Sequence, residues 1–236
     1  DAYGINMIPL MRLAIDCYQG HTSKTFNVHV RDDDKEYDRD YAEMDAMMHK
    51  AITIIQFKVE GQLIKKHPEW NMKERLLLDK IDYKQGTIKL GGKEYPLNDT
   101  YFPTIDPKDP YKLTHEEEDV VERLKNSFLG SERLQRHIRF LYTKGSLYKV
   151  YNGNLLYHGC VPLNEDGSFM KVRIFDKTYS GKALYDILEH YARKGYYSID
   201  PQEKQRGEDI LWFIWKNKHS PVFGKERMAT FERYFI

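Results

Sequence analysis

A histidine followed by a glycine stands at the end of a predicted strand and is the first candidate for chemistry. The run Asn154–Tyr157 is rich in apolar residues and leads into His158-Gly159. Asn152-Gly153 before it predicts a two-residue hairpin turn, because both central positions of such a turn favour a positive φ. Pro162 prevents the strand from continuing as an interior one. We therefore expect His158 at the end of a buried strand, where its neutral imidazole can ligate a metal ion.

A histidine packed in the interior is the alternative interpretation, because a catalytic metal needs several protein ligands and one histidine is not a site. Cys160 suggests a second kind of chemistry, that of a cysteine phosphatase. That chemistry needs a thiolate in a phosphate-binding loop with an arginine a few residues on. The residues that follow Cys160 are Val-Pro-Leu-Asn-Glu-Asp and include no arginine. We therefore reject the cysteine phosphatase.

Two clusters of charged residues are weaker candidates for a functional site, one for phosphate binding and one for cation binding. Arg133, Arg136, His137 and Arg139 lie close together before the hairpin and could bind phosphate. Arginines on an exposed helix surface are the ordinary interpretation of such a cluster. The run 31–40 contains four aspartates, Asp32, Asp33, Asp34 and Asp38. It lacks the spacing and closing glutamate of a calcium loop, so we interpret it as a solvated loop.

The segments that must position these residues alternate between helices and short strands. Apolar residues at helical spacing predict helices over 6–18, 41–66, 114–144 with a break near Gly130, 181–194 and 208–216. Short runs over 76–83, 87–90 and 93–97, separated by glycine turns, predict a small β-meander. Residues 98–113 carry three prolines and form a rigid connector. The sequence therefore predicts an α+β fold.

Composition narrows the classes of function. The chain has 236 residues, with 37 Lys and Arg against 36 Asp and Glu, so it lacks the basic field that attracts nucleic acid or anionic membranes. Cys17 and Cys160 are far apart and form no disulfide framework. Because there is no apolar run of about 20 residues and no signal pattern, we expect a cytoplasmic protein. The first residue is Asp1 and the last residues are aromatic, so we expect an interior piece of a longer polypeptide.

Three segments carry a specific resemblance. They are NDTYFPTIDPKDPY at 98–111, NLLYHGCVPLNEDG at 154–167 and SPVFGKERMATFERYF at 220–235. In these segments the chain resembles the class III fructose-1,6-bisphosphatase of Firmicutes-type bacteria. The similarity extends from the first helix to the last residue.

The resemblance implies a calcineurin-like metallophosphatase, whose core is a β-sandwich flanked by helices. Residues 146–236 would be a portion of that core, and residues 1–145 a mainly helical insertion with the β-meander at 76–97. His158 resembles one ligand of a two-metal centre, with manganese as the expected ion. Such an enzyme hydrolyses the 1-phosphate of fructose 1,6-bisphosphate to give fructose 6-phosphate, a step of gluconeogenesis. Lys225, Arg227 and Arg233 are the candidates for binding the sugar bisphosphate.

The chain also departs from the family pattern. It contains no Asp-x-His, no Gly-Asp-x-x-Asp-Arg-Gly, no Gly-Asn-His-Asp and no final Gly-His ligand segment. Gly20-His21 lies in a polar loop and is not a substitute. By position in the family, these motifs are expected before Asp1 and after Ile236, so we expect no catalytic residue within this chain and no activity from it alone.

Expected partners are the sugar bisphosphate and the remaining segments of the same polypeptide, with no nucleic acid and no membrane. The sequence leaves open whether the protein forms a homo-oligomer. The alternative function is that of a non-catalytic helical regulatory or interaction module, in which residues 3–144 form the partner surface.

Overall fold

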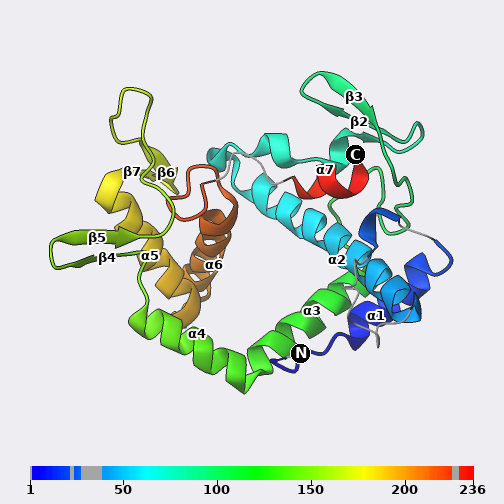
Figure 1. The fold of residues 1–236 in the computed structure, drawn as a ribbon, viewed down its shortest axis with the longest axis horizontal. Coiled ribbons are helices and arrows are strands. Elements are labelled where there is room, and N and C mark those ends of the chain that lie inside the picture. Colours follow the sequence, from blue (N-terminus) through cyan, green and yellow to red (C-terminus); the bar gives the residue numbers. More distant parts are fainter. Residues whose placement is uncertain (1, 22–23, 28–38, 225–228) are drawn as a thin grey trace. The chain divides into compact units, whose positions relative to one another are not determined.

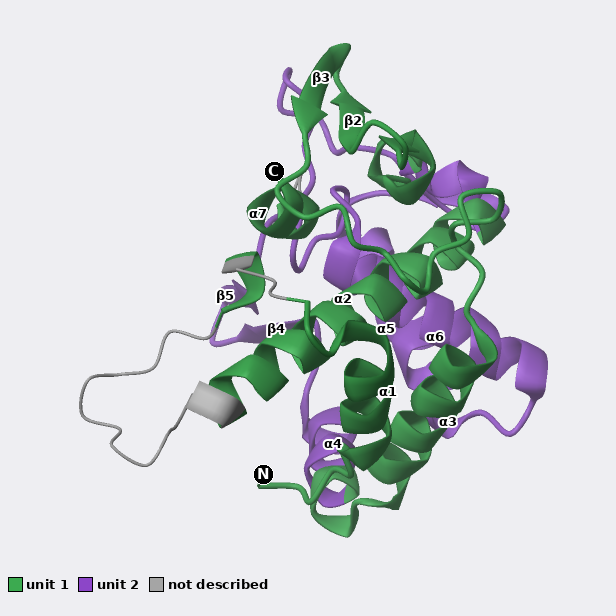
Figure 2. Ribbon diagram, turned by 90° about the vertical axis from the view of Figure 1, so that its right-hand side faces the viewer, with its two compact units in different colours: residues 1–66, 73–135, 229–236 green, residues 67–72, 136–228 purple. Residues whose placement is uncertain are grey.

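The computed structural model describes residues 2–21, 24–27, 39–224 and 229–236 (Figure 1). Two compact units divide the chain: unit 1 comprises 1–66, 73–135 and 229–236, and unit 2 comprises 67–72 and 136–228 (Figure 2). The described residues form seven α-helices and small antiparallel sheets, which confirms the α+β class. None of the described helices combines the length and apolar character that a membrane span requires. The predicted aspartate loop, with Asp32, Asp33, Asp34 and Asp38, lies outside the described residues.

Unit 1 is built on helices and one small sheet. Its α-helices are α1 (Ile8–Tyr18), α2 (Arg39–Lys66), α3 (His115–Gly130) and α7 (Thr230–Phe235), and its 3-10 helices are η1 (Lys24–Phe26), η3 (Lys73–Arg75) and η4 (Leu78–Lys80). Strands β1 (Ile81–Asp82), β2 (Thr87–Leu90) and β3 (Lys93–Pro96) pair in the order β1-β2-β3. The predicted meander is therefore present. Its first strand is shorter than expected, because Leu78–Lys80 forms a 3-10 turn.

Helix α2 contributes to two separate hydrophobic cores, as expected for a helix that is apolar on more than one face. Ala46 and Ile54 belong to a core with the β-meander and α7, whereas Met47, Ala51 and Ile55 pack with α1 and α3. Val59 of the same helix is 40% exposed, so the apolar residues at helical spacing in this segment are not all buried.

Two lysines of α2 are completely buried and are paired with carboxylates. Lys50 Nζ donates to both carboxylate oxygens of Asp99, at 2.9 and 2.7 Å. Burial lowers the pKa of Lys50, while the hydrogen bond to Asp99 opposes that shift. Lys58 Nζ lies 2.6 Å from Glu117 of α3. Helical periodicity alone does not indicate either pair.

The ends of helix α3 follow its sequence signals. The Thr114 side chain accepts a hydrogen bond from the Glu117 N–H, and Glu117 accepts one from the Thr114 N–H, which completes a capping box. The helix ends at Gly130, where a break was predicted. Helix α4 (Glu132–Lys144) then begins in unit 1 and continues into unit 2.

The aromatic residues at the end of the chain form a helix that apolar spacing does not predict. Phe231 and Phe235 of α7 are 1% and 0% exposed and lie in the core of unit 1. The Asn98 N–H donates to the carbonyl oxygen of Phe235 at 2.9 Å. Residues from two of the three segments that carry the family resemblance, 98–111 and 220–235, therefore meet in this unit.

Unit 2 contains the remaining elements. They are η2 (Pro68–Trp70), strands β4 (Tyr148–Tyr151), β5 (Asn154–Tyr157), β6 (Val172–Ile174) and β7 (Lys177–Tyr179), and helices α5 (Gly181–Tyr197) and α6 (Pro201–Lys216). The hairpin β6–β7 was not predicted. Helix α6 begins seven residues before its predicted start at Glu208, because Asp200 caps it and Pro201 occupies its first turn.

Helices α5 and α6 cross at two glycines. A Cβ on Gly207 would lie 2.0 Å from the backbone nitrogen of Gly195, and a Cβ on Gly195 would lie 2.7 Å from the carbonyl carbon of Gly207. The backbones can approach this closely only because neither residue has a side chain. Four apolar side chains of the two helices are at most 1% exposed: Leu184, Leu188, Ile210 and Phe213.

Candidate metal-ligand site around His158

The predicted hairpin before His158 is present in unit 2. Strands β4 and β5 pair in antiparallel register, with Tyr151 opposite Asn154 and Tyr148 opposite Tyr157. Asn152 and Gly153 form the turn with φ of 49° and 76°. Both values are positive, as the two-residue turn requires. The local sequence therefore determines this hairpin.

Helix α5 supports one end of the hairpin. The Tyr148 hydroxyl donates to Asp186 at 2.7 Å, and Lys182 Nζ lies 2.5 Å from the same carboxylate. Hydrogen bonds from Lys182 and Tyr148 hold the pKa of Asp186 below its ordinary value. The rings of Tyr148 and Tyr157 each pack edge-on against Tyr185, with centroids 5.6 and 6.3 Å away.

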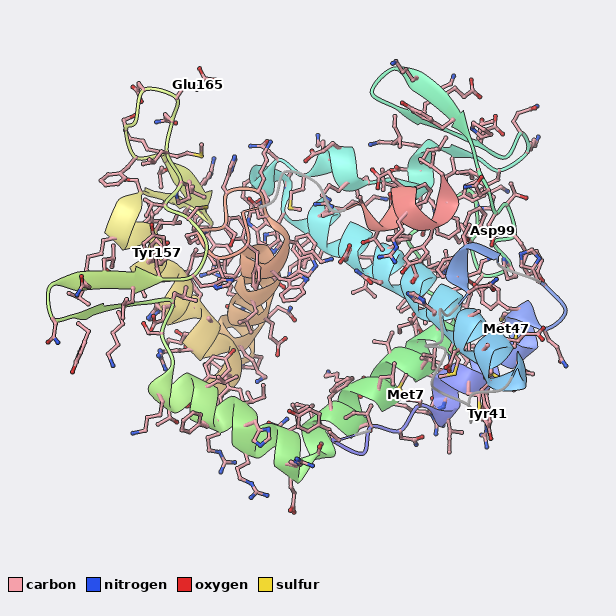
Figure 3. All side chains as sticks on the ribbon, in the orientation of Figure 1. Met7, Tyr41, Met47, Asp99, Tyr157 and Glu165 are labelled. Atoms are coloured by element: carbon pink, nitrogen blue, oxygen red, sulfur yellow. The ribbon has the colours of Figure 1, made fainter. Side chains whose placement is uncertain are left out.

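The expectation of a buried strand is wrong for this chain. Figure 3 labels Tyr157, the last residue of β5. Val150, Tyr151, Leu155, Leu156 and Tyr157 are 46–63% exposed. These apolar residues occupy both faces of a hairpin that pairs with no further strand among the described residues. The apolar pattern is present, but the layers that would bury it are absent from the described part of the chain.

His158 follows β5 and its side chain is exposed. Its ring packs against that of Phe223 at a centroid distance of 5.7 Å and an interplanar angle of 64°. The hydrogen bonds and ion pairs found among the described residues do not involve this imidazole. Because the ring is open to solvent, a nitrogen lone pair is accessible to an incoming cation. The alternative of a histidine packed in the core does not apply within this chain.

The backbone after His158 makes a close approach to the segment before Gly224. Gly159 has φ +98°, and a Cβ there would lie 2.3 Å from the Val222 carbonyl oxygen and 2.4 Å from that of Pro221. The Cys160 N–H donates to the Pro221 carbonyl oxygen at 2.9 Å. Glycine is therefore required at position 159 both for its backbone angle and for its small size.

The described residues offer one candidate metal ligand here, His158, and not a complete centre. Across the described ranges 2–21, 24–27, 39–224 and 229–236, no group of three His, Cys, Asp or Glu side chains is arranged to hold an ion. A solvent-accessible imidazole at the end of a strand is suited to one position in the coordination shell of a divalent transition metal. A complete centre would need further ligands from other residues.

Of the three residues predicted to bind the substrate, the structure describes only Arg233. Lys225 and Arg227 lie outside the described residues. Arg233 belongs to α7 in unit 1, and its guanidinium carbon lies 5.5 Å from the centre of the Tyr234 ring. Because Arg233 is exposed, its charged end is accessible to an anion.

The arginine cluster shows the ordinary surface arrangement. Arg133 donates to the carbonyl oxygen of Ala2 at 3.1 Å, and Arg136, His137 and Arg139 are exposed on α4. The cysteine near His158 also has local contacts. Cys160 lies with its Sγ 3.9 Å from the Ser220 carbonyl oxygen, and its own carbonyl accepts from the Tyr185 hydroxyl at 2.9 Å.

Sequence reasoning missed the structured turn that faces His158. Residues 217–224 lie beside Gly159 and Cys160, although about 60 residues separate the two segments in the chain. The sequence signal for this turn is a pair of polar residues, Asn217 and Ser220, within an aromatic stretch. In the structure both side chains are 0% exposed. Polar residues in such a setting are typical of a hydrogen-bonded turn.

Comparison with known protein families shows to which family this chain belongs. Residues 1–236 match the sequence profile of a family described as Firmicute fructose-1,6-bisphosphatase. The chain belongs to this family. The resemblance carried by residues 98–111, 154–167 and 220–235 is thereby confirmed.

Individual members of the Firmicute fructose-1,6-bisphosphatase family show how much of a protein this chain represents. A protein of Clostridium beijerinckii named fructose-1,6-bisphosphatase class 3 1 is 51% identical over 236 residues, which are 100% of this chain and 35% of the relative. Fructose-1,6-bisphosphatase class 3 of Clostridioides difficile is 54% identical over 237 residues, 100% of this chain and 36% of the relative. The chain thus spans little more than a third of these relatives. No solved structure matches it.

Proposed function

We propose that this chain is part of a metal-dependent phosphatase that hydrolyses the 1-phosphate of fructose 1,6-bisphosphate, a reaction of gluconeogenesis. The observation that carries the proposal is the family match over all 236 residues. The names of the relatives agree with it, since each is called a class 3 fructose-1,6-bisphosphatase.

Residues 146–236 form a portion of a calcineurin-like core, and residues 1–145 form the helical insertion. The exposed β4–β5 hairpin supports this assignment, because apolar residues on both of its faces remain open to solvent and an isolated two-stranded hairpin is at best marginally stable in water. The remaining segments of the polypeptide, which in the relatives make up about two thirds of the length, are the partners that cover it.

His158 is one ligand of a two-metal centre, and the native ion is Mn2+. Bound divalent ions would supply an activated water and stabilise the negative charge of the phosphate. The role of this chain is to hold the His158 imidazole in a fixed direction at the end of β5. Imidazole nitrogen is a suitable donor for such ions.

Cationic side chains near the end of the chain bind the phosphate that does not react. Arg233 supports this proposal because it is exposed and because Arg suits bidentate contacts with phosphate oxygens. Lys225 and Arg227 are proposed on their sequence alone. The protein acts in the cytoplasm, and a homo-oligomer is compatible with the proposal.

The proposal is tested by comparing two purified proteins, the full-length polypeptide and the 1–236 chain. Both are assayed for phosphate release from fructose 1,6-bisphosphate with added Mn2+. We expect activity from the full-length protein and none from 1–236, because one imidazole cannot hold two ions. An inactive full-length protein that binds no Mn2+ would instead favour the non-catalytic module. A metal-dependent rate from 1–236 alone would show that the site is assigned to the wrong residues.

A further inference from the structure

The turn formed by residues 217–224 is held by hydrogen bonds to two buried side chains, Asn217 and Ser220. The Asn217 side chain donates to the Trp70 carbonyl oxygen at 3.3 Å and accepts from the His219 N–H at 2.8 Å. The Ser220 hydroxyl donates to the Ile214 carbonyl oxygen at 2.6 Å. Both side chains are 0% exposed, so their polar atoms depend on these partners.

Ser220 also fixes the backbone that leads to Phe223. Its Oγ accepts from the Val222 N–H at 3.2 Å and from the Phe223 N–H at 3.3 Å, and its carbonyl oxygen accepts from the Gly224 N–H at 2.9 Å. The turn therefore presents Phe223 in one defined direction.

The same turn contacts the backbone on the C-terminal side of His158. The hydrogen bond from Cys160 to Pro221 and the close approach at Gly159 place the two segments against each other. The backbone of the residue after the candidate ligand is thus fixed by the turn, while β5 fixes the backbone before it.

Phe223 completes the arrangement by contacting the imidazole itself. Its ring contacts two others, that of His158 at a centroid distance of 5.7 Å and that of Trp215 at 4.9 Å. Trp215 is 55% exposed and belongs to α6, a well-packed helix. Tilted and edge-to-face aromatic contacts at these distances are favourable, so Phe223 restricts the directions that the His158 ring can take.

We infer that Phe223, held by the Ser220 turn and backed by Trp215, is a positioning residue that orients the His158 imidazole for metal ligation. This inference rests on the proposed function, in which His158 is a ligand. It goes beyond it by assigning a role to residues that have no ligand atoms of their own. Outer-shell partners that hydrogen-bond a metal-ligating histidine typically change metal affinity by about 10–100-fold when substituted, and an aromatic contact is expected at the low end of that range.

The test measures the dissociation constant for Mn2+, by electron paramagnetic resonance of the free ion, in the full-length protein. Phe223→Leu removes the ring and should weaken Mn2+ binding about ten-fold, at the low end of that range. Phe223→Tyr keeps the ring and should restore affinity to within two-fold of the wild type. Phe140→Leu is the matched control, because Phe140 is 63% exposed on α4 of the same unit. It should leave Mn2+ affinity unchanged.

Each outcome separates the inference from the proposed function. If Phe223→Leu binds Mn2+ as tightly as the wild type while His158→Ala does not, the positioning role is wrong and the ligand assignment stands. If His158→Ala retains full affinity, the proposed function itself fails. Should Phe223→Leu not fold, Trp215→Leu serves instead, since it removes the ring behind Phe223 at a more exposed position. Unchanged affinity in Trp215→Leu would also overturn the inference.

Discussion

Gly159 is the residue on which the geometry next to His158 depends most directly. An alanine there would have to adopt φ +98° and would clash with the carbonyl oxygens of Pro221 and Val222. We predict that Gly159→Ala lowers the free energy of unfolding by about 2–3 kcal/mol, the range of a strained backbone with a steric clash.

Gly153→Ala provides the comparison for this prediction. Gly153 also has a positive φ, +76°, but no atom lies within 4 Å of the position that an added Cβ would take. Gly153→Ala should therefore lower the free energy of unfolding by only about 1 kcal/mol, the cost of placing a residue with a Cβ in the left-handed region. Thermal unfolding of the two full-length variants measures the difference. Equal destabilisation would mean that the approach between Gly159 and the 217–224 turn is not tight.

A second prediction at this scale concerns pH and His67. Its imidazole lies 2.8 Å from Glu69 through Nδ1 and 2.8 Å from Asp209 through Nε2. Burial acts to lower the pKa of His67, but the hydrogen bonds to Asp209 and Glu69 outweigh it, so the pKa lies above the ordinary value of 6.5. Protonation of His67 is therefore favoured in the folded state.

The sign of the pH dependence follows from this raised pKa. The stabilisation is fully present below pH 6.5 and is lost as the pH rises through the folded-state pKa. We expect the thermal midpoint of the full-length protein to fall over that interval, and His67→Gln to remove this part of the slope. An unchanged pH profile in His67→Gln would refute the assignment.

The conformation of a single residue was predictable from the sequence where neighbouring residues in the chain determine it. Asn152-Gly153, for example, predicted the two-residue turn between β4 and β5. The facing turn was not predictable, because the contact between Cys160 and Pro221 joins residues 61 positions apart. The pairing of Lys50 with Asp99 was missed for the same reason: helical periodicity does not reveal a carboxylate 49 residues away.

At the scale of elements, the crossing of α5 and α6 depends on two glycines. A Cβ on Gly207 would lie 2.0 Å from Gly195 N and 2.4 Å from the Tyr191 carbonyl oxygen. These are backbone atoms and cannot move aside. We predict that Gly207→Ala lowers the free energy of unfolding by about 3 kcal/mol, as expected for overpacking.

The matched control is Gly130→Ala, at the end of α3. No atom lies within 4 Å of the added Cβ there, so the substitution should be neutral or should stabilise by up to about 1 kcal/mol. Chemical denaturation of both variants gives the comparison. A neutral Gly207→Ala would indicate that the two helices cross at a larger distance.

Long helices and helices with capping residues were predictable from the sequence, whereas short elements were not. The long helix α2 and the capped helix α3 agreed with their apolar spacing and, for α3, with its capping box. The three-residue strands of β6–β7 are too short to show a period, and α7 consists of six residues with aromatic side chains typical of a strand. The exposure of β4–β5 was not predictable, because an apolar pattern does not say which segment covers it.

At the scale of the whole molecule, the exposed hairpin predicts how the chain packs in the full-length protein. If the remaining polypeptide covers β4–β5, Leu156 becomes a core residue, although it is 53% exposed within residues 1–236. We expect Leu156→Glu to destabilise the full-length protein by at least about 2 kcal/mol, through burial of an unpaired charge.

Lys177→Glu on β7 is the control for this substitution, since Lys177 is an exposed polar residue of the same unit. It should change stability by no more than about 0.5 kcal/mol. Thermal unfolding of the full-length variants measures both effects. If Leu156→Glu is as mild as Lys177→Glu, the hairpin remains exposed and residues 146–236 are not part of a larger sheet.

The central claim is that His158 is a metal ligand whose companion ligands lie elsewhere in the polypeptide. The most direct measurement is the Mn2+ content per chain of full-length wild type and His158→Ala after gel filtration, with His190→Ala, an exposed histidine of α5, as the control. We predict that wild type and His190→Ala retain the ion and that His158→Ala loses it. Equal Mn2+ content in all three proteins would contradict the claim.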